Sequence, residues 1–185
     1  MAHLLLIDAL NLIRRLYAVQ ERPYLPVTDE VAEGTKTQII RNTENMLRQA
    51  LARLQQELAP SHAVLVFDGR NSLWRKTLYA EYKANRKPMP TILADALPGL
   101  QLCAKALGFD SVQQDEYEAD DIIASVAVKL VQHGQQVTIV STDKGFLPLL
   151  SQNIQIYDAF ARQHQTEEAV QQKFGVSTTQ LVRYW

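Results

Sequence analysis

The chain has 185 residues, of which 46% are apolar and 21% charged, and its formal net charge at pH 7 is −1. These values fit one folded domain with a hydrophobic core, and they exclude both a disordered chain and a generally basic nucleic-acid-binding protein. The single cysteine, Cys103, excludes a disulfide framework within the chain. Neither a signal peptide nor a membrane span is expected, so the sequence predicts a cytoplasmic protein with one domain over residues 1–185.

Apolar runs and helical patterns alternate in the first half of the chain. Leu4–Ile7 is a continuous apolar run that ends on Asp8, which predicts a buried strand, and residues 10–17 follow at helical spacing. Two prolines and a glycine in residues 21–36 predict a mobile loop. Apolar residues at helical spacing then predict a long helix that Pro60 closes.

The alternation continues in the second half. Strands are predicted at residues 63–67, 109–112, 137–140 and 154–157. Helices are predicted at residues 91–107, where Pro98 kinks or splits the helix, behind the acidic cluster up to Gly134, at residues 146–150 and at the end of the chain. The βαβ order predicts an α/β fold, with a mostly parallel sheet sandwiched by helices.

An acidic cluster lies in residues 113–121, where five of nine residues are acids and none is basic. The apolar residues behind it recur at helical spacing, which places Glu118, Asp120 and Asp121 at a helix N-terminus. The helix dipole favours an acid there by about 0.3–1 kcal/mol, which explains one or two acids better than a group. A divalent cation would relieve the repulsion between them. A solvated acidic face stays open as the alternative.

Acids also follow the predicted strands. Three apolar strands end in Asp8, Asp68 and Asp143, and a fourth leads into the acidic cluster. In a parallel sheet these ends lie along one edge, where α/β proteins bind ligands, so six carboxylates are expected to converge. Taken singly, each aspartate fits a turn or a helix cap equally well. Neither a GxGxxG nor a P-loop motif follows the first strand, so a nucleotide-binding fold is not favoured.

Positive charge is concentrated between Arg70 and Lys87. This segment contains six bases and one acid, which leaves a net charge of −6 on the rest of the chain. Tyr79 and Tyr82 lie among the bases, and this mixture suits phosphate pairing and base stacking better than a plain solvated helix face.

Five motifs in order carry a family resemblance: Asp8, Phe67-Asp68, Tyr82-Lys-Ala-Asn-Arg86, Glu118-Ala-Asp-Asp121 and Ser141-Thr-Asp-Lys144. Together they resemble the 5′-nuclease or flap endonuclease family, which includes the 5′–3′ exonuclease domain of bacterial DNA polymerase I. The match is closest to stand-alone bacterial exonucleases of the exonuclease IX type. The resemblance implies a PIN-like core with a basic helical arch at about residues 70–90. It also implies metal-dependent hydrolysis of DNA at 5′ ends or flap junctions in replication or repair.

The resemblance also assigns roles to residues. It implies one or two Mg²⁺ ions, with Mn²⁺ as a substitute, and a monomer acting on DNA with a 5′ end or a 5′ flap. Lys83 and Arg86 are expected to act catalytically on the scissile phosphate, and both also to bind DNA. The further expected DNA contacts are Arg15, Arg75 and Tyr82. The expected metal ligands are Asp8, Asp68, Glu118, Asp120, Asp121 and Asp143.

Two departures from the family pattern leave alternatives open. Asp143-Lys144-Gly145 stands where the family has Asp-x-Asp, so a second metal ion is expected to bind more weakly. The family's C-terminal helix–three-turn–helix DNA-binding region is also absent from these 185 residues. A DNA-structure-binding module with little or no catalysis is therefore one alternative. A PIN-like ribonuclease, which shares the sheet and its acidic edge, is the other.

Overall fold

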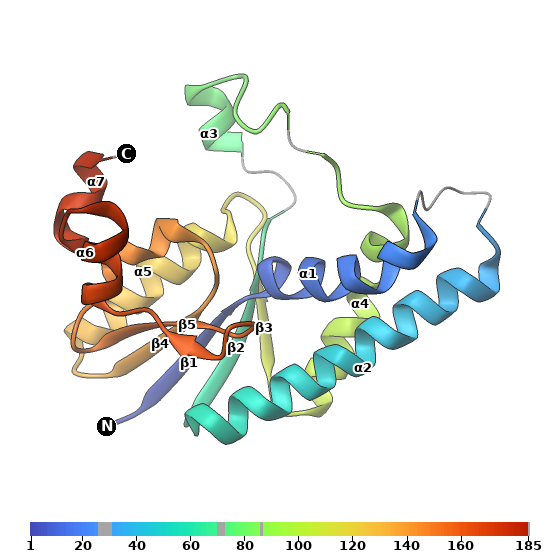
Figure 1. Cartoon of the computed structure of the whole chain (residues 1–185), viewed down its shortest axis with the longest axis horizontal. Helices are drawn as coiled ribbons and strands as arrows, with labels where there is room; N and C mark the ends of the chain where they lie inside the picture. The colour runs from blue at the N-terminus through green and yellow to red at the C-terminus, as the bar shows by residue number, and fades with distance from the viewer. Residues whose placement is uncertain (26–30, 70–72, 86, 185) are drawn as a thin grey trace.

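A six-stranded sheet forms the centre of the computed structural model, which describes residues 1–25, 31–69, 73–85 and 87–184 (Figure 1). The strand order is β3-β2-β1-β4-β5-β6, and only β6 runs antiparallel to its neighbour. The predicted mostly parallel α/β fold is therefore confirmed, and the antiparallel strand was not predicted. The strands are β1 (His3–Asp8), β2 (His62–Phe67), β3 (Asp110–Gln113), β4 (Gln136–Val140), β5 (Ile154–Asp158) and β6 (Gln163–His164).

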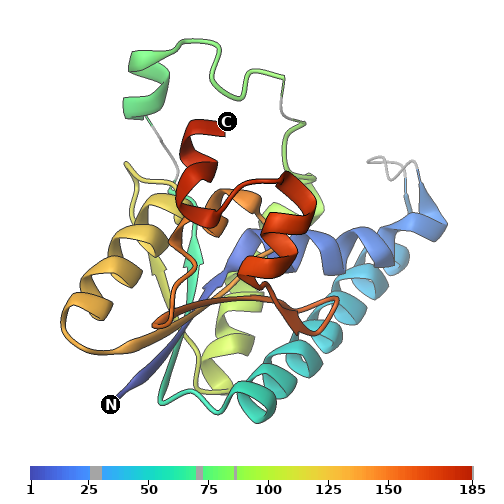
Figure 2. The same ribbon diagram turned by 60° about the vertical axis from the view of Figure 1, so that its left-hand side comes forward.

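Helices cover both faces of the sheet (Figures 1 and 2). The α-helices are α1 (Ala9–Glu21), α2 (Glu33–Leu58), α3 (Leu73–Leu78), α4 (Thr91–Ala106), α5 (Ala119–Gln132), α6 (Glu167–Phe174) and α7 (Leu181–Tyr184). The 3₁₀ helices are η1 (Arg22–Tyr24), η2 (Lys144–Leu149) and η3 (Thr178–Gln180). Within the described residues, no helix has the length and apolarity needed to cross a membrane.

Two hydrophobic clusters flank the sheet. The first packs α1, α2 and α4 on one face, and the second packs α5, η2 and α6 on the other. Successive side chains of β1 point to opposite faces of the sheet and so enter different clusters. Leu5 and Ile7 belong to the first cluster and Leu6 to the second, and all three are at most 2% exposed. Burial on both faces explains the continuous apolar run, and it fixes the carboxyl end of β1 at the centre of the sheet edge.

Several boundaries differ from the sequence-based predictions. The predicted loop at residues 21–36 was wrong at both ends, because η1 forms at residues 22–24 and α2 already begins at Glu33, while residues 26–30 lie outside the described part. Pro98 does not split its helix, which is continuous from Thr91 to Ala106. The predicted short helix at residues 146–150 is the 3₁₀ helix η2, which starts earlier and contains Pro148.

Residues 73–85, which lie within the basic segment, project beyond the carboxyl ends of the strands (Figure 1). We call residues 73–85 the arch segment. Its helical part is only the six residues of α3, and a turn region follows over residues 79–85. Because β1 and β2 are parallel, Asp8 at the end of β1 and Asp68 directly after β2 lie at the same edge of the sheet.

Candidate metal and nucleic-acid site

Asp8 is the last residue of β1 and the N-cap of α1. Its Oδ1 accepts a hydrogen bond from the Asn11 backbone N–H at 3.1 Å, and its Oδ2 accepts one from the Ser141 hydroxyl at 3.1 Å. Burial raises the pKa of Asp8 above its ordinary value, and the charges of Asp68 and Asp143 raise it further, against the lowering effect of the two hydrogen bonds. Oδ1 of Asp8 therefore caps α1, so the helix-cap role that the sequence left open for this aspartate is observed.

Three further aspartates reach the same place from different elements. Asp68 follows β2 and accepts a hydrogen bond from the Ala119 N–H at 2.8 Å, which joins this strand end to the start of α5. Asp120 lies in the first turn of α5, and Asp143 caps η2 after β4. The four aspartates share a pocket of about 460 Å³, whose lining is Asp8, Leu10, Asn11, Arg14, Arg15, Asp68, Lys83, Lys87, Asp120 and Asp143.

Asp120 is influenced by its burial and by the charges of the other three aspartates. Burial, followed by the charges of Asp8, Asp143 and Asp68, raises the pKa of Asp120 to about 7. Carboxylate oxygens in mutual repulsion form the donor set that Mg²⁺ and Mn²⁺ prefer, so these residues fit a hard divalent cation. Among the described residues, no three His, Cys, Asp or Glu side chains are already drawn together as a ligand set.

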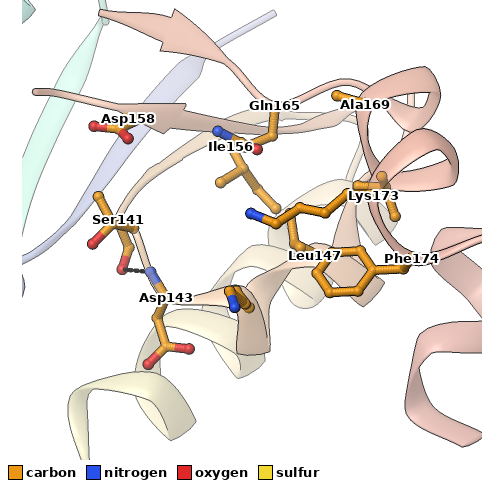
Figure 3. Close-up of a pocket in the computed structure, with 12 residues that line it drawn as sticks. Ser141, Asp143, Leu147, Ile156, Asp158, Gln165, Ala169, Lys173 and Phe174 are labelled. Atoms are coloured by element: carbon orange, nitrogen blue, oxygen red, sulfur yellow. Dashed lines mark hydrogen bonds between the residues drawn. The ribbon is translucent and has the colours of Figure 1, made fainter. Parts of the chain in front are cut away.

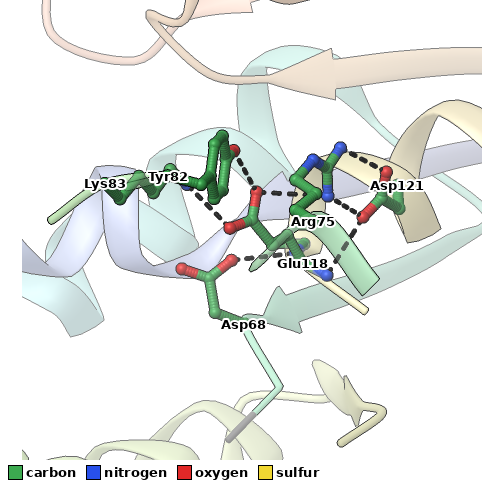
Figure 4. Close-up of polar contacts among 7 residues, drawn as sticks. Asp68, Arg75, Tyr82, Lys83, Glu118 and Asp121 are labelled. Carbon is green, nitrogen blue, oxygen red and sulfur yellow. Dashed lines mark hydrogen bonds and ion pairs between the residues drawn. The ribbon is translucent and has the colours of Figure 1, made fainter. Parts of the chain in front are cut away.

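Glu118, the N-cap of α5, points to the arch segment (Figure 4). Its Oε1 accepts a hydrogen bond from Lys83 Nζ at 2.9 Å, its Oε2 accepts one from the Tyr82 hydroxyl at 3.0 Å, and Arg75 Nη1 lies 3.3 Å from Oε2. Burial favours a higher pKa for Glu118, but the hydrogen bonds from Lys83 and Tyr82 outweigh it and leave the pKa below its ordinary value. Glu118 is therefore an ionised carboxylate held by three arch residues.

Asp121 also pairs with the arch segment. Both of its oxygens accept hydrogen bonds from the Arg75 guanidinium, one of them at 2.6 Å, and Oδ2 accepts a third from the Glu118 N–H at 3.2 Å (Figure 4). The hydrogen bonds to Asp121 raise the pKa of Arg75. Asp121 thus completes a capping box at the start of α5 and does not line the four-aspartate pocket, unlike Asp120 beside it.

Lys83 reaches Glu118 through an unusual backbone conformation. Its φ of 55° lies in the left-handed region, which costs a non-glycine residue on the order of 1–3 kcal/mol. Hydrogen bonds from Tyr82 N to Tyr79 O and from Ala84 N to Glu81 O, both 3.0 Å, form the turns around it. Arg86, the other predicted catalytic residue, lies outside the described residues.

Gly145 stands beside Asp143, and its N–H donates to Asp143 Oδ1 at 2.8 Å. A Cβ at this position would lie 3.2 Å from the same oxygen, so a side chain here would sit next to the Asp143 carboxylate. Asp143 also borders a second hollow of about 280 Å³ that extends towards α6 and includes Lys144 and Lys173 (Figure 3). Gly145 itself lines a different hollow of about 280 Å³, which it shares with Asp120, Asp121 and Asp143.

Sequence reasoning missed two contributors to the site. Asn11 Oδ1 accepts hydrogen bonds from the Thr142 N–H at 3.2 Å and from the Thr142 hydroxyl at 3.1 Å, which holds the end of β4 against α1. Phe160, in the turn after β5, lies under Arg15, whose Cζ is 4.1 Å from the ring centroid. The position of Asn11 three residues after Asp8 was a usable signal, whereas nothing in the sequence marked Phe160.

Comparison with known protein families agrees with this arrangement. The model of the 5′–3′ exonuclease N-terminal resolvase-like domain matches residues 3–175. The chain belongs to this family. Among curated members, it is 52% identical to the flap endonuclease Xni of Colwellia psychrerythraea, over 100% of the chain and 65% of that protein. It is 43% identical to the Xni of Vibrio vulnificus, over 99% of the chain and 66% of that protein. The chain therefore spans about two thirds of these relatives.

Known structures place this 5′–3′ exonuclease family chain in the same fold. A T5 5′-exonuclease with bound zinc superposes with a TM-score of 0.73 at 18% identity, over 97% of the chain and 64% of that protein. The T5 D15 flap endonuclease in a complex with DNA and metal ions gives a TM-score of 0.63 at 18% identity, over 97% and 64%. At this level of identity the likeness establishes the fold.

Proposed function

We propose that the protein is a divalent-metal-dependent 5′-nuclease that hydrolyses DNA phosphodiesters at 5′ ends or flap junctions during replication or repair. The observation that carries the proposal is the shared pocket, in which four aspartates from separate elements are bordered by Arg14, Arg15, Lys83 and Lys87. Relatives named flap endonucleases, and the T5 structure in complex with DNA and metal ions, support this substrate class. Cytoplasmic location and a monomeric state stay predictions.

In this proposal Asp8, Asp68, Asp120 and Asp143 hold the ion, and Mg²⁺, with Mn²⁺ as a substitute, is the cation that suits them. When bound, a divalent ion supplies Lewis-acid polarisation of the phosphate and lowers the pKa of the attacking water. Glu118 would join this set if Lys83 released it to bind the substrate. Asp121 supports the set from outside the pocket through its hydrogen bonds to Arg75 and Glu118. One or two ions are proposed, with the second held weakly because Gly145 adds no carboxylate.

The bases act on the phosphate backbone. Lys83 belongs to the arch segment, lines the pocket and pairs with Glu118, so its ammonium group can donate to a phosphate oxygen on which negative charge develops. Arg15 contacts a neighbouring phosphate at the rim, and Tyr82 offers a ring for stacking with an unpaired base. The proposed role of Arg86 as a second catalytic cation that holds the scissile phosphate rests on the family resemblance. Arg75 contributes to DNA binding chiefly by fixing the arch segment on α5.

The test is cleavage of a labelled 5′-flap duplex in Mg²⁺. We expect a short 5′ product that EDTA abolishes and that Asp120→Asn reduces by at least about 100-fold, because the variant loses a pocket carboxylate. Asp110→Asn, at an exposed position at the start of β3, serves as the matched control with unchanged cleavage. Undiminished cleavage by Asp120→Asn would overturn the assignment of the pocket.

Gly145 favours one alternative, a DNA-structure-binding module with weak or no catalysis, because the pocket lacks one carboxylate of the family motif. That alternative predicts tight, salt-sensitive binding of the flap without product over long incubation in Mg²⁺ or Mn²⁺. The same assay with an RNA flap tests the PIN-like ribonuclease alternative, which requires faster cleavage of RNA than of DNA.

A further inference from the structure

We infer that Phe160 is a positioning residue, which holds the guanidinium of Arg15 at the rim of the pocket as a preformed contact for a backbone phosphate of the substrate. The inference rests on the proposed function and names a residue outside every motif of the sequence. The two side chains come from α1 and from the turn between β5 and β6, and they meet at 4.1 Å between Arg15 Cζ and the ring centroid of Phe160.

The turn that carries Phe160 is fixed on the side of β5. Asp158 ends β5, and its Oδ1 accepts hydrogen bonds from the N–H groups of Phe160 and Ala161 at 2.8 and 3.0 Å. This arrangement sets the direction in which the chain leaves the sheet. Phe160 itself is 37% exposed, so its ring covers little of the hydrophobic core, and its one described aromatic contact is with Arg15.

The other side of the turn is fixed by Glu57 of α2. Its carboxylate pairs with the Arg162 guanidinium and accepts a hydrogen bond from the Tyr157 hydroxyl at 2.7 Å. Arg162 has a φ of 55°, in the left-handed region, so the chain turns sharply at the residue that makes this pair. The ring of Phe160 is thus presented from a turn held by two independent sets of hydrogen bonds.

Arg15 is suited to receive a ligand in this position. It lines the pocket, yet it makes no ion pair with any carboxylate of the described residues. Phe160 contacts Arg15 through its ring and offers no hydrogen-bond acceptor, so the guanidinium N–H donors that point away from the ring stay available for a phosphate. The ring also reduces the number of conformations that an exposed arginine would otherwise sample, so less freedom is lost on binding.

Four variants separate positioning from simple packing: Phe160→Ala, Phe160→Tyr, Arg15→Ala and the double Phe160→Ala/Arg15→Ala. Binding of a fluorescent 5′-flap duplex is measured in EDTA over a range of NaCl concentrations. We expect Phe160→Ala to weaken binding about 3-fold to 5-fold, the range of an exposed cation–π contact. We expect Arg15→Ala to weaken it at least as much, the double variant to match Arg15→Ala, and Phe160→Tyr to bind within about 2-fold of wild type.

A second readout needs no DNA. The Nε–H resonance of Arg15 should show an upfield ring-current shift in the wild type and in Phe160→Tyr, and it should lose that shift in Phe160→Ala. An unshifted resonance in the wild type would overturn the inference, as would a double variant whose loss is the product of the two single losses. If wild-type and Phe160→Ala proteins bind alike while Arg15→Ala is impaired, the inference fails and the proposed nuclease function stands. Wild-type protein that neither binds nor cleaves flap DNA would overturn both.

Discussion

Lys83 Nζ lies 2.9 Å from Oε1 of Glu118, so a base of the arch segment occupies a carboxylate at the edge of the candidate metal pocket. The Tyr82 hydroxyl and Arg75 bind the other oxygen of the same carboxylate. Under the proposed function, a cation in the pocket would compete with Lys83 for Glu118, and a backbone phosphate would compete with Glu118 for Lys83.

Lys83→Ala should separate metal binding from turnover. Removal of the ammonium frees Oε1 of Glu118 and lowers the positive potential in the pocket, so Mg²⁺ should bind a few-fold more tightly in the absence of DNA. Cleavage of the flap should nevertheless fall by about 100-fold, because a donor to the developing phosphate charge is lost. Calorimetric titration with Mg²⁺ and steady-state cleavage at saturating Mg²⁺ measure the two effects.

Lys87→Ala is the matched control for the metal titration, because Lys87 lines the same pocket without an ion pair to any described carboxylate. Its Mg²⁺ affinity should rise less than that of Lys83→Ala, since only the general potential changes. Equal gains in the two variants would show that the contact between Lys83 and Glu118 does not compete with the ion.

Asp120→Asn should stabilise the metal-free fold at alkaline pH. The pKa of Asp120 is raised from 3.8 to about 7, so the folded state keeps its proton between about pH 4 and 7, where the unfolded state has lost it. Stability from this group is therefore fully present below about pH 4 and is lost as the pH rises to 7. The variant removes a penalty of at most about 4 kcal/mol at pH 8.

Urea unfolding in EDTA at pH 4 and pH 8 tests this prediction. The gain of Asp120→Asn over the wild type should be present at pH 8 and absent at pH 4, and the exposed Asp110→Asn should show none at either pH. A loss of stability at pH 8 would mean that Asp120 forms a favourable interaction as a carboxylate, contrary to the repulsion described above.

Gly145→Asp should strengthen a second metal site. The new side chain starts 3.2 Å from Asp143 Oδ1, so its carboxylate would share the space beside Asp143 after a shift of a few tenths of an ångström. We expect half-maximal cleavage at a several-fold lower Mg²⁺ concentration and a higher ion stoichiometry in calorimetry. Gly145→Asn has the same shape without the charge and should leave both values close to wild type. If the two variants behave alike, the effect is steric.

How much of this site the sequence predicts depends on the kind of contact. Asp8 and Asp68 were predicted to converge because apolar runs place them at the ends of parallel strands, and the register of β1 and β2 aligns those ends. The family resemblance placed Asp120 and Asp121 together as ligands, but consecutive residues of a helix point in different directions. In the structure Asp120 lines the pocket while Asp121 binds Arg75.

Contacts between distant loops could not be predicted. The pairing of Lys83 with Glu118 depends on a left-handed residue in a turn that contains no glycine, and the stacking of Phe160 on Arg15 depends on the path of the chain between β5 and β6. Likewise β6 is two residues long, too short for an alternating pattern to appear. The spacing of apolar residues indicates which side chains are buried, whereas these two contacts and β6 depend on the conformation of turns.

Arg75→Gln should loosen the arch segment. Arg75 is 21% exposed and binds both oxygens of Asp121, which makes it a charged link between α3 and α5. Loss of a charge-assisted pair of this kind costs about 1.5–3 kcal/mol, so amide hydrogen exchange over residues 73–85 should accelerate about 10-fold or more. Arg48→Gln, which removes a surface pair with Glu44, serves as a control and should leave the arch unchanged. Unaltered exchange in Arg75→Gln would show that other contacts hold the segment.

The most direct test of the central claim is the position of a bound ion. Crystals soaked in Mn²⁺ and measured at the manganese absorption edge report the metal without interference from water. We predict an anomalous peak within ligand distance of carboxylate oxygens of Asp8, Asp68 and Asp120, with any weaker second peak next to Asp143. A pocket without a peak at saturating Mn²⁺, or a peak bound only to exposed acids elsewhere, would contradict the assignment of a nuclease metal site.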